Sequence, residues 1–395
     1  MASHQDFSDH QQLIAELTPF RTKPELLASA AYQKHRGYLT DLLATPQVFP
    51  AANPRPRIHD FLRIAHWNIE KGKHLEDVIA AFRHHPILRA ADLISINEAD
   101  VGMNRSAQAF VACELGAALG MHVAFAPCYL EFSKGYGDDL TMPGENTVAL
   151  QGNAILSRYE LQQPRVIQLP LCYDHFEHVE KRIGNRNALV VEIERNGKRL
   201  SFVTTHLEVR NAPACRAQQI AAILAELEKP GAPQAAIIAG DFNSNTFARG
   251  GLLRTLSGLL RMMFSATADL RQAIAAPQAR EPLFALLAQH GFTDAGFNSD
   301  DVTCYVPLRI LEDSGKLPGF LAAAINQQMA RYNGQLDFRL DWLIGRGVQP
   351  LGAQSVIDAE TKSASLPPQT IAGLRTNSGG QITDHDPITV DLLLS

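Results

Sequence analysis

The chain has 395 residues, of which 46% are hydrophobic, and it carries a formal net charge of −5. This composition is ordinary for a globular protein with a sizeable core. Proteins that bind the nucleic-acid backbone usually carry a large excess of basic residues. The net negative charge therefore argues against an extensive nucleic-acid-binding surface, but it still allows a local basic patch. No apolar stretch approaches the ~20 residues of a membrane span, so we expect no transmembrane segment.

The five cysteines are scattered, odd in number and without Cys-x-x-Cys spacing. This pattern argues against a disulfide framework and against a zinc site, and it favours a reducing compartment. The first residues are polar and lack the apolar centre of a signal peptide. The sequence therefore predicts a cytoplasmic protein.

Residues 1–60 are predicted to form an N-terminal helical arm and linker. Residues 11–17 and 24–43 have helical periodicity, and residues 45–57 are rich in Pro and Ala. We expect this arm to pack across a catalytic domain that spans residues 61–395.

From residue 62 onward, short apolar runs alternate with helical stretches. Strands are predicted at 62–69, 91–98, 122–126, 149–156, 187–194, 200–206, in the run that ends at Asp241, and at 339–344 and 388–394. Helices are predicted at 74–84, 106–119, 214–228, 252–275, 282–290 and 320–331. Strands that alternate with crossover helices indicate an α/β protein whose sheets are covered by helices on their outer faces.

The most informative segment is the apolar run that ends in Gly240-Asp241-Phe242-Asn243. Residues two apart in an extended chain point the same way, so Asp241 and Asn243 would face one site from the end of a buried strand. An acid beside an amide suits the positioning of a water molecule and donation to a phosphoryl oxygen.

Five other apolar runs end in polar residues. They are Trp67-Asn68-Ile69-Glu70, Ile96-Asn97-Glu98, Val203-Thr204-Thr205-His206-Leu207, Arg339-Leu340-Asp341-Trp342 and Thr383-Asp384-His385-Asp386-Pro387. Any one of them alone is more often a turn former or a core residue. Six in one chain predict a site built from the ends of many strands.

In this order, the segments resemble the endonuclease/exonuclease/phosphatase superfamily, which includes DNase I-like nucleases, neutral sphingomyelinases and inositol polyphosphate 5-phosphatases. The resemblance extends over residues 62–394 and includes the segments 152–158 and 291–295. It implies a DNase I-like four-layer sandwich, in which two mixed β-sheets lie face to face with helices outside. Such a fold explains how one domain can hold a chain of this length.

The resemblance implies a metal-dependent hydrolase of phosphodiester or phosphomonoester bonds. Hard oxygen ligands without thiolates favour Mg²⁺ or Mn²⁺ over zinc. Glu98 is the best single ligand candidate, with Asn68 close by, and Asp384 would complete the shell directly or through water. Asp241 would orient or deprotonate the attacking water, and Asn243 would donate to the phosphate.

Two histidines complete the expected catalytic set. His385 would lie near the scissile group, and a pairing with Asp341 would raise the imidazole pKa by favouring the charged form. Whether His385 acts as a base or as a cationic phosphate clamp is left open by the sequence. His206 fits a proton donor or an oxyanion ligand on the leaving-group side, and it argues against an AP endonuclease, which resembles the rest of the family but carries Asn there.

Substrate contacts are expected from Arg186, with Lys181 and Arg182 behind it, because Arg suits bidentate phosphate binding. A solvated charged loop is the alternative. Asn153 is a further candidate for the cleft. His175 and His178 are interpreted as surface residues, because no third metal ligand is nearby in the sequence.

Acidic balance and His206 favour a small or lipid-type phosphoester, or loosely bound nucleic acid, as the substrate. A DNA or RNA endonuclease or exonuclease of the same family is the closest alternative. A catalytically inactive binding module would be expected to lack Glu98, Asp241 or His385, and all three are present. Protein partners are not predicted.

Overall fold

The computed structural model describes residues 7, 9–244, 275–307 and 335–394. The helices predicted at 252–275 and 320–331 fall outside these residues, except for Ala275. None of the described helices is both long and apolar enough to cross a lipid bilayer.

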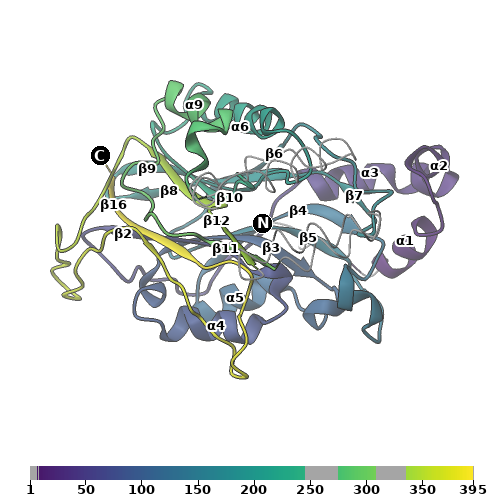
Figure 1. Ribbon diagram of the computed structural model, residues 1–395, viewed down its shortest axis with the longest axis horizontal. Helices are drawn as coiled ribbons and strands as arrows, with labels where there is room; N and C mark the ends of the chain where they lie inside the picture. Colours follow the sequence, from purple (N-terminus) through teal and green to yellow (C-terminus); the bar gives the residue numbers. More distant parts are fainter. Residues whose placement is uncertain (1–6, 8, 245–274, 308–334, 395) are drawn as a thin grey trace.

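Two mixed β-sheets lie face to face between two layers of helices (Figure 1). The larger sheet has nine strands in the order β1-β4-β5-β3-β2-β16-β14, with β7 paired to β4 and β15 paired to β16. Its strands are β1 Gln47–Phe49, β2 Leu62–Asn68, β3 Leu93–Val101, β4 His122–Glu131, β5 Leu150–Ser157, β7 Arg182–Gly184, β14 Val348–Pro350, β15 Gln369–Thr370 and β16 Ile388–Leu394.

The smaller sheet has five strands in the order β13-β10-β9-β8-β6. Its strands are β6 Gln162–Gln168, β8 Asn187–Arg195, β9 Lys198–His206, β10 Ala235–Asp241 and β13 Asp341–Arg346. A separate hairpin pairs β11 Cys304–Pro307 with β12 Gln335–Phe338. Parallel pairing of β2 with β3 and of β9 with β10 brings the carboxyl ends of neighbouring strands to the same sheet edge.

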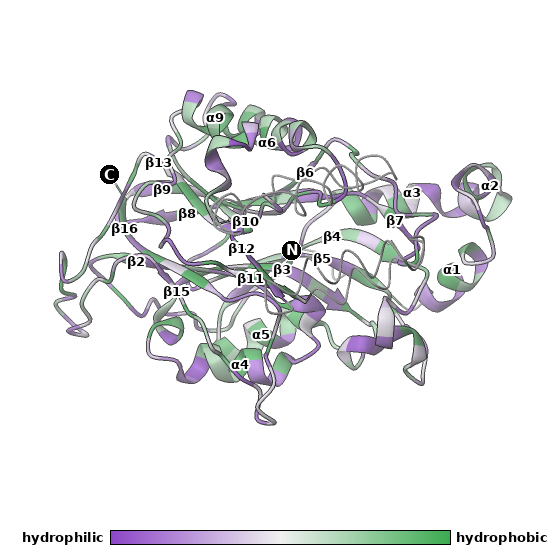
Figure 2. Cartoon of the chain, viewed as in Figure 1, coloured by the Kyte–Doolittle hydropathy of each residue, from purple (hydrophilic) through white to green (hydrophobic). Residues whose placement is uncertain are grey.

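Helices cover the outer face of each sheet. The larger sheet is covered by α4 Leu75–His84 and α5 Val111–Leu119. The N-terminal helices α1 His10–Leu17, α2 Lys23–Ala28 and α3 Ala30–Ala44 contribute to the same cluster of apolar residues. The smaller sheet is covered by α6 Pro213–Leu227 and α9 Pro282–Gln289. Figure 2 shows apolar and polar residues together in α4 and α6, as expected for helices with one face on a sheet and the other in solvent. The predicted four-layer α/β sandwich is confirmed.

The alternation of side chains along β2 shows how one strand contributes to two clusters of core residues. Leu62 and Ile64 belong to the cluster between the two sheets, whereas Ala65 and Trp67 belong to the cluster under the helices of the larger sheet. Successive side chains of a strand point to opposite faces, so each apolar strand contributes to two clusters. At the end of such a strand, alternate side chains therefore point into the layer between the sheets.

The N-terminal region differs from its prediction in two places. The single helix expected at 24–43 is two helices, because Ser29 adopts an extended conformation and caps α3 by accepting from the backbone N–H of Tyr32. The expected linker at 45–57 contains β1, which pairs antiparallel with β4. The division into an arm of residues 1–60 and a catalytic domain stays a prediction.

Candidate active site

The layer between the sheets is apolar at one end of the strands and polar at the other. In the larger sheet, the inward-facing residues change from Leu62 and Ile64 to His66 and Asn68 along β2, and from Leu93 to Ser95 and Asn97 along β3. In the smaller sheet, they change from Leu200 and Phe202 to Thr204 and His206 along β9, and from Ile237 and Ala239 to Asp241 along β10. The same change runs backwards along the antiparallel β13, from Leu343 to Asp341. The polar ends of both sheets therefore meet in one place.

Four predicted site residues lie together at this polar end. Nδ2 of Asn68 donates to Oδ2 of Asp241 at 3.2 Å and to Oε1 of Glu98 at 3.4 Å. His206 lies between the same two carboxylates, with Nε2 3.3 Å from Oδ2 of Asp241 and Nδ1 3.9 Å from Oε1 of Glu98. Residues from β2, β3, β9 and β10 thus share one site.

His385 and Asp341 form the second part of the site. Nδ1 of His385 lies 2.7 Å from Oδ2 of Asp341, and Nε2 lies 3.9 Å from Oδ2 of Asp241. Burial opposes the charged imidazole, but the negative charge and hydrogen bond of Asp341 outweigh it and raise the pKa of His385 well above its ordinary value. The same pairing lowers the pKa of Asp341 against the effect of its burial.

Two site residues have left-handed backbone conformations that few non-glycine residues adopt. Glu98 has φ 58° at a point where the register of β3 with β5 shifts between Ile96 and Ala99. Asn243 has φ 47°; its backbone N–H donates to Oδ1 of Asp241 at 2.8 Å, and its Nδ2 donates to the carbonyl of Leu207 at 2.9 Å. Strained conformations of this kind concentrate at functional sites, where they redirect side chains.

The surroundings of Glu98 keep its carboxylate ionised. Burial alone would favour the neutral acid, but the positive charges of Lys71 and Arg186 outweigh it and lower the pKa of Glu98. Nζ of Lys71 lies 3.7 Å from Oε2 of Glu98. The ionised carboxylate of Glu98 offers the hard oxygen donors that Mg²⁺ and Mn²⁺ prefer. The amide of Asn68 directs its nitrogen at Glu98, and its Oδ1 accepts from the backbone N–H of Glu70 at 3.2 Å.

Asp384 lies on the His385 side of the site. Its carboxylate forms a group with Cys304 and His385 whose ligand atoms all lie within 4.8 Å of one another, and a second such group among the described residues joins Asp241, Asp341 and His385. Burial and then the charge of Asp384 raise the pKa of Glu70, so this acid also lies near the site.

The two expected substrate contacts have different surroundings. Asn153 is buried below the site, where its Oδ1 accepts from Asn97 at 2.8 Å and its Nδ2 donates to Oδ1 of Asn187 at 3.1 Å. The guanidinium of Arg186 is also buried, and its Nε has no hydrogen-bond partner within the part of the chain that the structure describes. A buried cation with an unused donor is suited to an anionic ligand.

The basic segment before Arg186 is not a solvated loop. Arg182 is buried, lies over the ring of Tyr129 at 4.0 Å and pairs with Glu131 at 3.2 Å. Lys181 instead donates to the carbonyl of Thr18 at 2.6 Å, so its charge is directed toward the N-terminal helices.

The interpretation of His175 as a surface residue is wrong. Its side chain is buried, with Nε2 3.3 Å from Oε2 of Glu208, and its Nδ1 lies 3.4 Å from the guanidinium of Arg182. The residue comes from a loop whose polar sequence concealed its burial. Hydrogen bonds on both ring nitrogens explain how a histidine is accommodated there.

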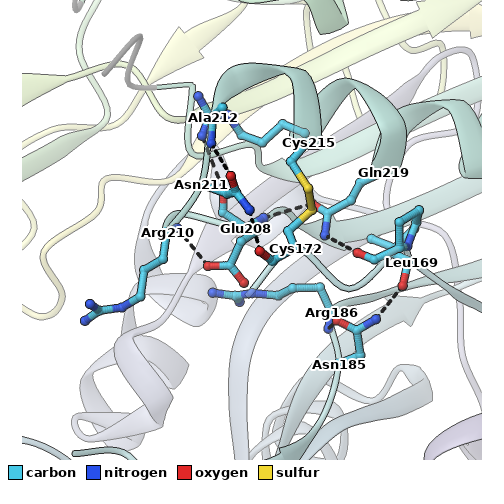
Figure 3. The surroundings of a disulfide bond; sticks show 12 residues. Leu169, Cys172, Asn185, Arg186, Glu208, Arg210, Asn211, Ala212, Cys215 and Gln219 are labelled. Atoms are coloured by element: carbon cyan, nitrogen blue, oxygen red, sulfur yellow. Dashed lines mark hydrogen bonds between the residues drawn. A yellow bond between two sulfur atoms is a disulfide. The ribbon is translucent and has the colours of Figure 1, made fainter. Parts of the chain in front are cut away.

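The structure contains a disulfide, which contradicts the argument against a disulfide framework. Cys172 and Cys215 are bonded, with their Cα atoms 6.0 Å apart, and the bond joins the loop before β7 to the first turn of α6. Figure 3 shows Glu208, Arg186 and Asn211 around this bond. The argument for a reducing compartment from cysteine spacing therefore loses its basis.

Sequence reasoning missed two buried residues that hold the site together. His66 contacts Asp341, with Nε2 3.0 Å from its Oδ1, and Asn97 accepts the backbone N–H of Asp241 at 2.8 Å. His66 stands two residues before Asn68, and Asn97 directly precedes Glu98. The period of two along each strand is the signal that could have placed His66 on the same face as Asn68.

Comparison with known proteins identifies the family of the chain. The model of the Endonuclease/Exonuclease/phosphatase family matches residues 65–362. Among solved structures, a family protein from Bacteroides thetaiotaomicron is 10% identical with a TM-score of 0.48, covering 85% of this chain and 98% of that one. The human nocturnin catalytic domain with bound sulfate is 14% identical with a TM-score of 0.44, covering 89% and 97%.

A third similar structure is D. rerio TDP2 complexed with a single-strand DNA product, 15% identical with a TM-score of 0.42 over 84% of this chain and 99% of that one. No curated protein matches the sequence at a significant level. The family model covers more than half of the chain, and the protein belongs to the endonuclease/exonuclease/phosphatase family.

Proposed function

We propose that this protein is a Mg²⁺- or Mn²⁺-dependent hydrolase of phosphodiester or phosphomonoester bonds. The observation that carries the proposal is the convergence of strand-end side chains from both sheets, which are Asn68, Glu98, His206, Asp241, Asp341 and His385. Family membership supports phosphoester hydrolysis as the reaction class.

Glu98 and Asn68 are proposed to hold the cation, with Asp384 as a further ligand, directly or through water. The carboxylate oxygens and the ionised state of Glu98 support its assignment. Asn68 would present Oδ1 to the cation after a flip of its amide, because Nδ2 faces Glu98 in the structure. When bound, the cation would neutralise charge on the phosphoryl oxygens and lower the pKa of coordinated water.

The remaining side chains are proposed to act on the water and the phosphate. Asp241 would orient the attacking water and accept its proton. His385 is better suited to clamp a phosphoryl oxygen as a cation than to act as a base, because Asp341 at 2.7 Å favours the charged imidazole. His206 would face the leaving oxygen, and Asn243 would donate to the phosphate.

Arg186 is proposed as a second contact for the substrate phosphate, because it is a buried cation with an unused donor. Asn153 is proposed to support this side of the site through Asn187 rather than through an exposed amide. A small or lipid-type phosphoester is the favoured substrate class, given the net charge of −5.

A panel of substrates tests the proposal. Bis-p-nitrophenyl phosphate, p-nitrophenyl phosphate, sphingomyelin, inositol phosphates, RNA, and single- and double-stranded DNA are each incubated with Mg²⁺, Mn²⁺ or EDTA. Metal-dependent hydrolysis that is lost in His385→Ala supports the proposal, and no hydrolysis of any phosphoester contradicts it. His10→Gln, a change in a buried histidine of α1, is the matched control.

The alternative is a DNA or RNA endonuclease or exonuclease of the same family. Salt distinguishes the two, because binding to a nucleic-acid backbone weakens steeply as salt rises, whereas binding of a small phosphoester does not. A steep salt dependence of KM on DNA or RNA, together with higher kcat/KM than on small phosphoesters, would favour the nuclease. Tight metal-independent binding without turnover would favour an inactive binding module.

A further inference from the structure

A layer of polar side chains separates the apolar core between the sheets from the site above it. Its members are His66 of β2, Ser95 of β3 and Thr204 of β9, and each is fully buried. They occupy the positions where each strand changes from apolar to polar inward-facing residues. Burial of polar groups is unfavourable unless they are hydrogen-bonded, so their contacts are informative.

His66 contacts the carboxylate that holds His385. Nε2 of His66 lies 3.0 Å from Oδ1 of Asp341, while Oδ2 of the same carboxylate lies 2.7 Å from Nδ1 of His385 and accepts from Oγ1 of Thr303 at 2.6 Å. Asp341 thus lies between two histidines, one on each oxygen. With both oxygens bonded, the carboxylate has a fixed rotation about its side chain.

The other nitrogen of His66 leads to Asp241. Nδ1 of His66 lies 2.8 Å from Oγ of Ser95, which lies 2.7 Å from Oγ1 of Thr204. Nδ2 of Asn97 donates to Oγ1 of Thr204 at 3.2 Å, and Oδ1 of Asn97 accepts the backbone N–H of Asp241 at 2.8 Å. An unbroken chain of buried hydrogen bonds therefore joins Asp341 to Asp241.

One assignment of donors and acceptors satisfies every hydrogen bond of this chain. In it, Asn97 donates to Thr204, the Thr204 hydroxyl donates to Ser95, and the Ser95 hydroxyl donates to Nδ1 of His66. The ring proton of His66 is then on Nε2, where it donates to Asp341. Every polar atom in this chain is used, as expected for a network that fixes one arrangement of its members.

We propose that His66 is a positioning residue for the site, which fixes the rotation of Asp341 and, through it, the ring of His385 relative to Asp241. The role in turnover rests on the proposed function, whereas the geometric role does not. Without the His66 donor, Oδ1 of Asp341 would be buried and unpaired, and the carboxylate could rotate away from His385.

Three variants test this role. His66→Leu removes both hydrogen bonds and should lower kcat about 10- to 100-fold with KM nearly unchanged, the loss expected for a hydrogen bond to a charged group. His66→Gln keeps a donor and should recover part of the loss. Ser95→Ala leaves His66 in place without the partner of its Nδ1 and should give an intermediate kcat.

His10→Gln is the matched control, because His10 is equally buried and its Nδ1 is bonded to the carbonyl of Val148 at 2.8 Å in the N-terminal region. It should lower thermal stability and leave kcat unchanged. Equal effects of His10→Gln and His66→Leu on kcat, or a wild-type kcat in His66→Leu, would overturn the proposal.

A second measurement does not depend on activity. The imidazole N–H proton of His385 that is bonded to Asp341 is followed by NMR, assigned by its loss in His385→Ala. We expect this resonance to shift or broaden in His66→Leu and Ser95→Ala and to persist in His10→Gln. An unchanged resonance in both site variants refutes the positioning role, even if no phosphoester proves to be a substrate. If His66→Leu does not fold, kcat and the NMR resonance are measured in Ser95→Ala and His66→Gln instead.

Discussion

His206 and Asp241 are register partners in the parallel pairing of β9 with β10, and Nε2 of His206 lies 3.3 Å from Oδ2 of Asp241. Both residues are the last of their strands. Burial, followed by the negative charges of Asp341 and Glu98, raises the pKa of Asp241 to about 7, although the charge of His385 opposes this shift. A carboxylate with a pKa near neutrality can accept a proton from water.

Asp241→Asn should therefore lower kcat by about 10²- to 10⁴-fold, the usual contribution of a general base. The amide is nearly isosteric and should leave the fold intact, which circular dichroism checks. Asp174→Asn is the matched control, because Asp174 is a partly exposed acid paired with Lys23. Normal turnover by Asp241→Asn would remove this residue from the proposed mechanism.

Glu98→Gln tests the proposed cation site. Burial disfavours the ionised form of Glu98, and the nearby charge of Lys71 favours it. The isosteric amide of Gln removes the negative charge that a bound cation would contact. Activity should fall together with affinity for Mg²⁺, measured as the Mg²⁺ concentration for half-maximal rate and by calorimetry. Glu145→Gln, on an exposed side chain paired with Lys134, should change neither. Unchanged activity and Mg²⁺ affinity in Glu98→Gln would refute the ligand role.

Arg186→Lys separates substrate binding from chemistry. Lys keeps the positive charge but loses the planar donors that bind a phosphate through two hydrogen bonds. KM should rise more than kcat falls. Lys181→Gln is the control, since Lys181 donates to the carbonyl of Thr18. A KM that stays at its wild-type value in Arg186→Lys would show that Arg186 does not contact the substrate.

Much of the fold follows from the sequence, because apolar runs of strand length alternate with amphipathic helices. The strands that the hydrophobic pattern does not predict are those whose formation depends on pairing with another strand. β6, for example, contains Pro164 and is mostly half-buried, and it is a strand because it pairs with β8. The strands β11 and β12 have four residues each and form a hairpin outside both main sheets.

The polar strand ends could be predicted because each follows an apolar run. His66 could not be recognised in the same way, because it stands inside an apolar run and its partner Asp341 is far away in the sequence. The disulfide likewise joins residues 43 positions apart, and only the packing of the loop against α6 brings Cys172 to Cys215. Sequence spacing carries no information about such pairs.

Loss of the disulfide should lower the free energy of unfolding. Closing a loop between Cys172 and Cys215 restricts the unfolded chain, and removal of such a bond usually costs about 2–4 kcal/mol. Denaturant unfolding of Cys172→Ser and Cys215→Ser, with and without a reductant, measures the effect. Cys113→Ser, at a free cysteine, is the control. If the reductant leaves the wild-type midpoint unchanged, the bond does not stabilise the protein.

His175 should make the stability of the protein depend on pH. Burial lowers its pKa to about 4 from the ordinary value of 6.5. The hydrogen bond that His175 donates to Glu208 opposes this shift, and the charge of Arg182 adds to it. The geometry agrees, because the Arg182 guanidinium donates to Nδ1 of His175 and leaves no room for a proton there.

In the unfolded chain, the imidazole of His175 binds a proton below its ordinary pKa of 6.5, whereas in the folded chain it stays neutral until about pH 4. Acidification therefore favours unfolding. From about pH 7 to about pH 5, His175 should remove about 2 kcal/mol from the free energy of unfolding. Denaturant unfolding at these two pH values should show a smaller loss in His175→Gln, because Gln does not titrate, whereas His84→Gln at an exposed histidine should behave as the wild type. A loss of equal size in His175→Gln and in the wild type would show that His175 is protonated in the folded protein as readily as in the unfolded chain.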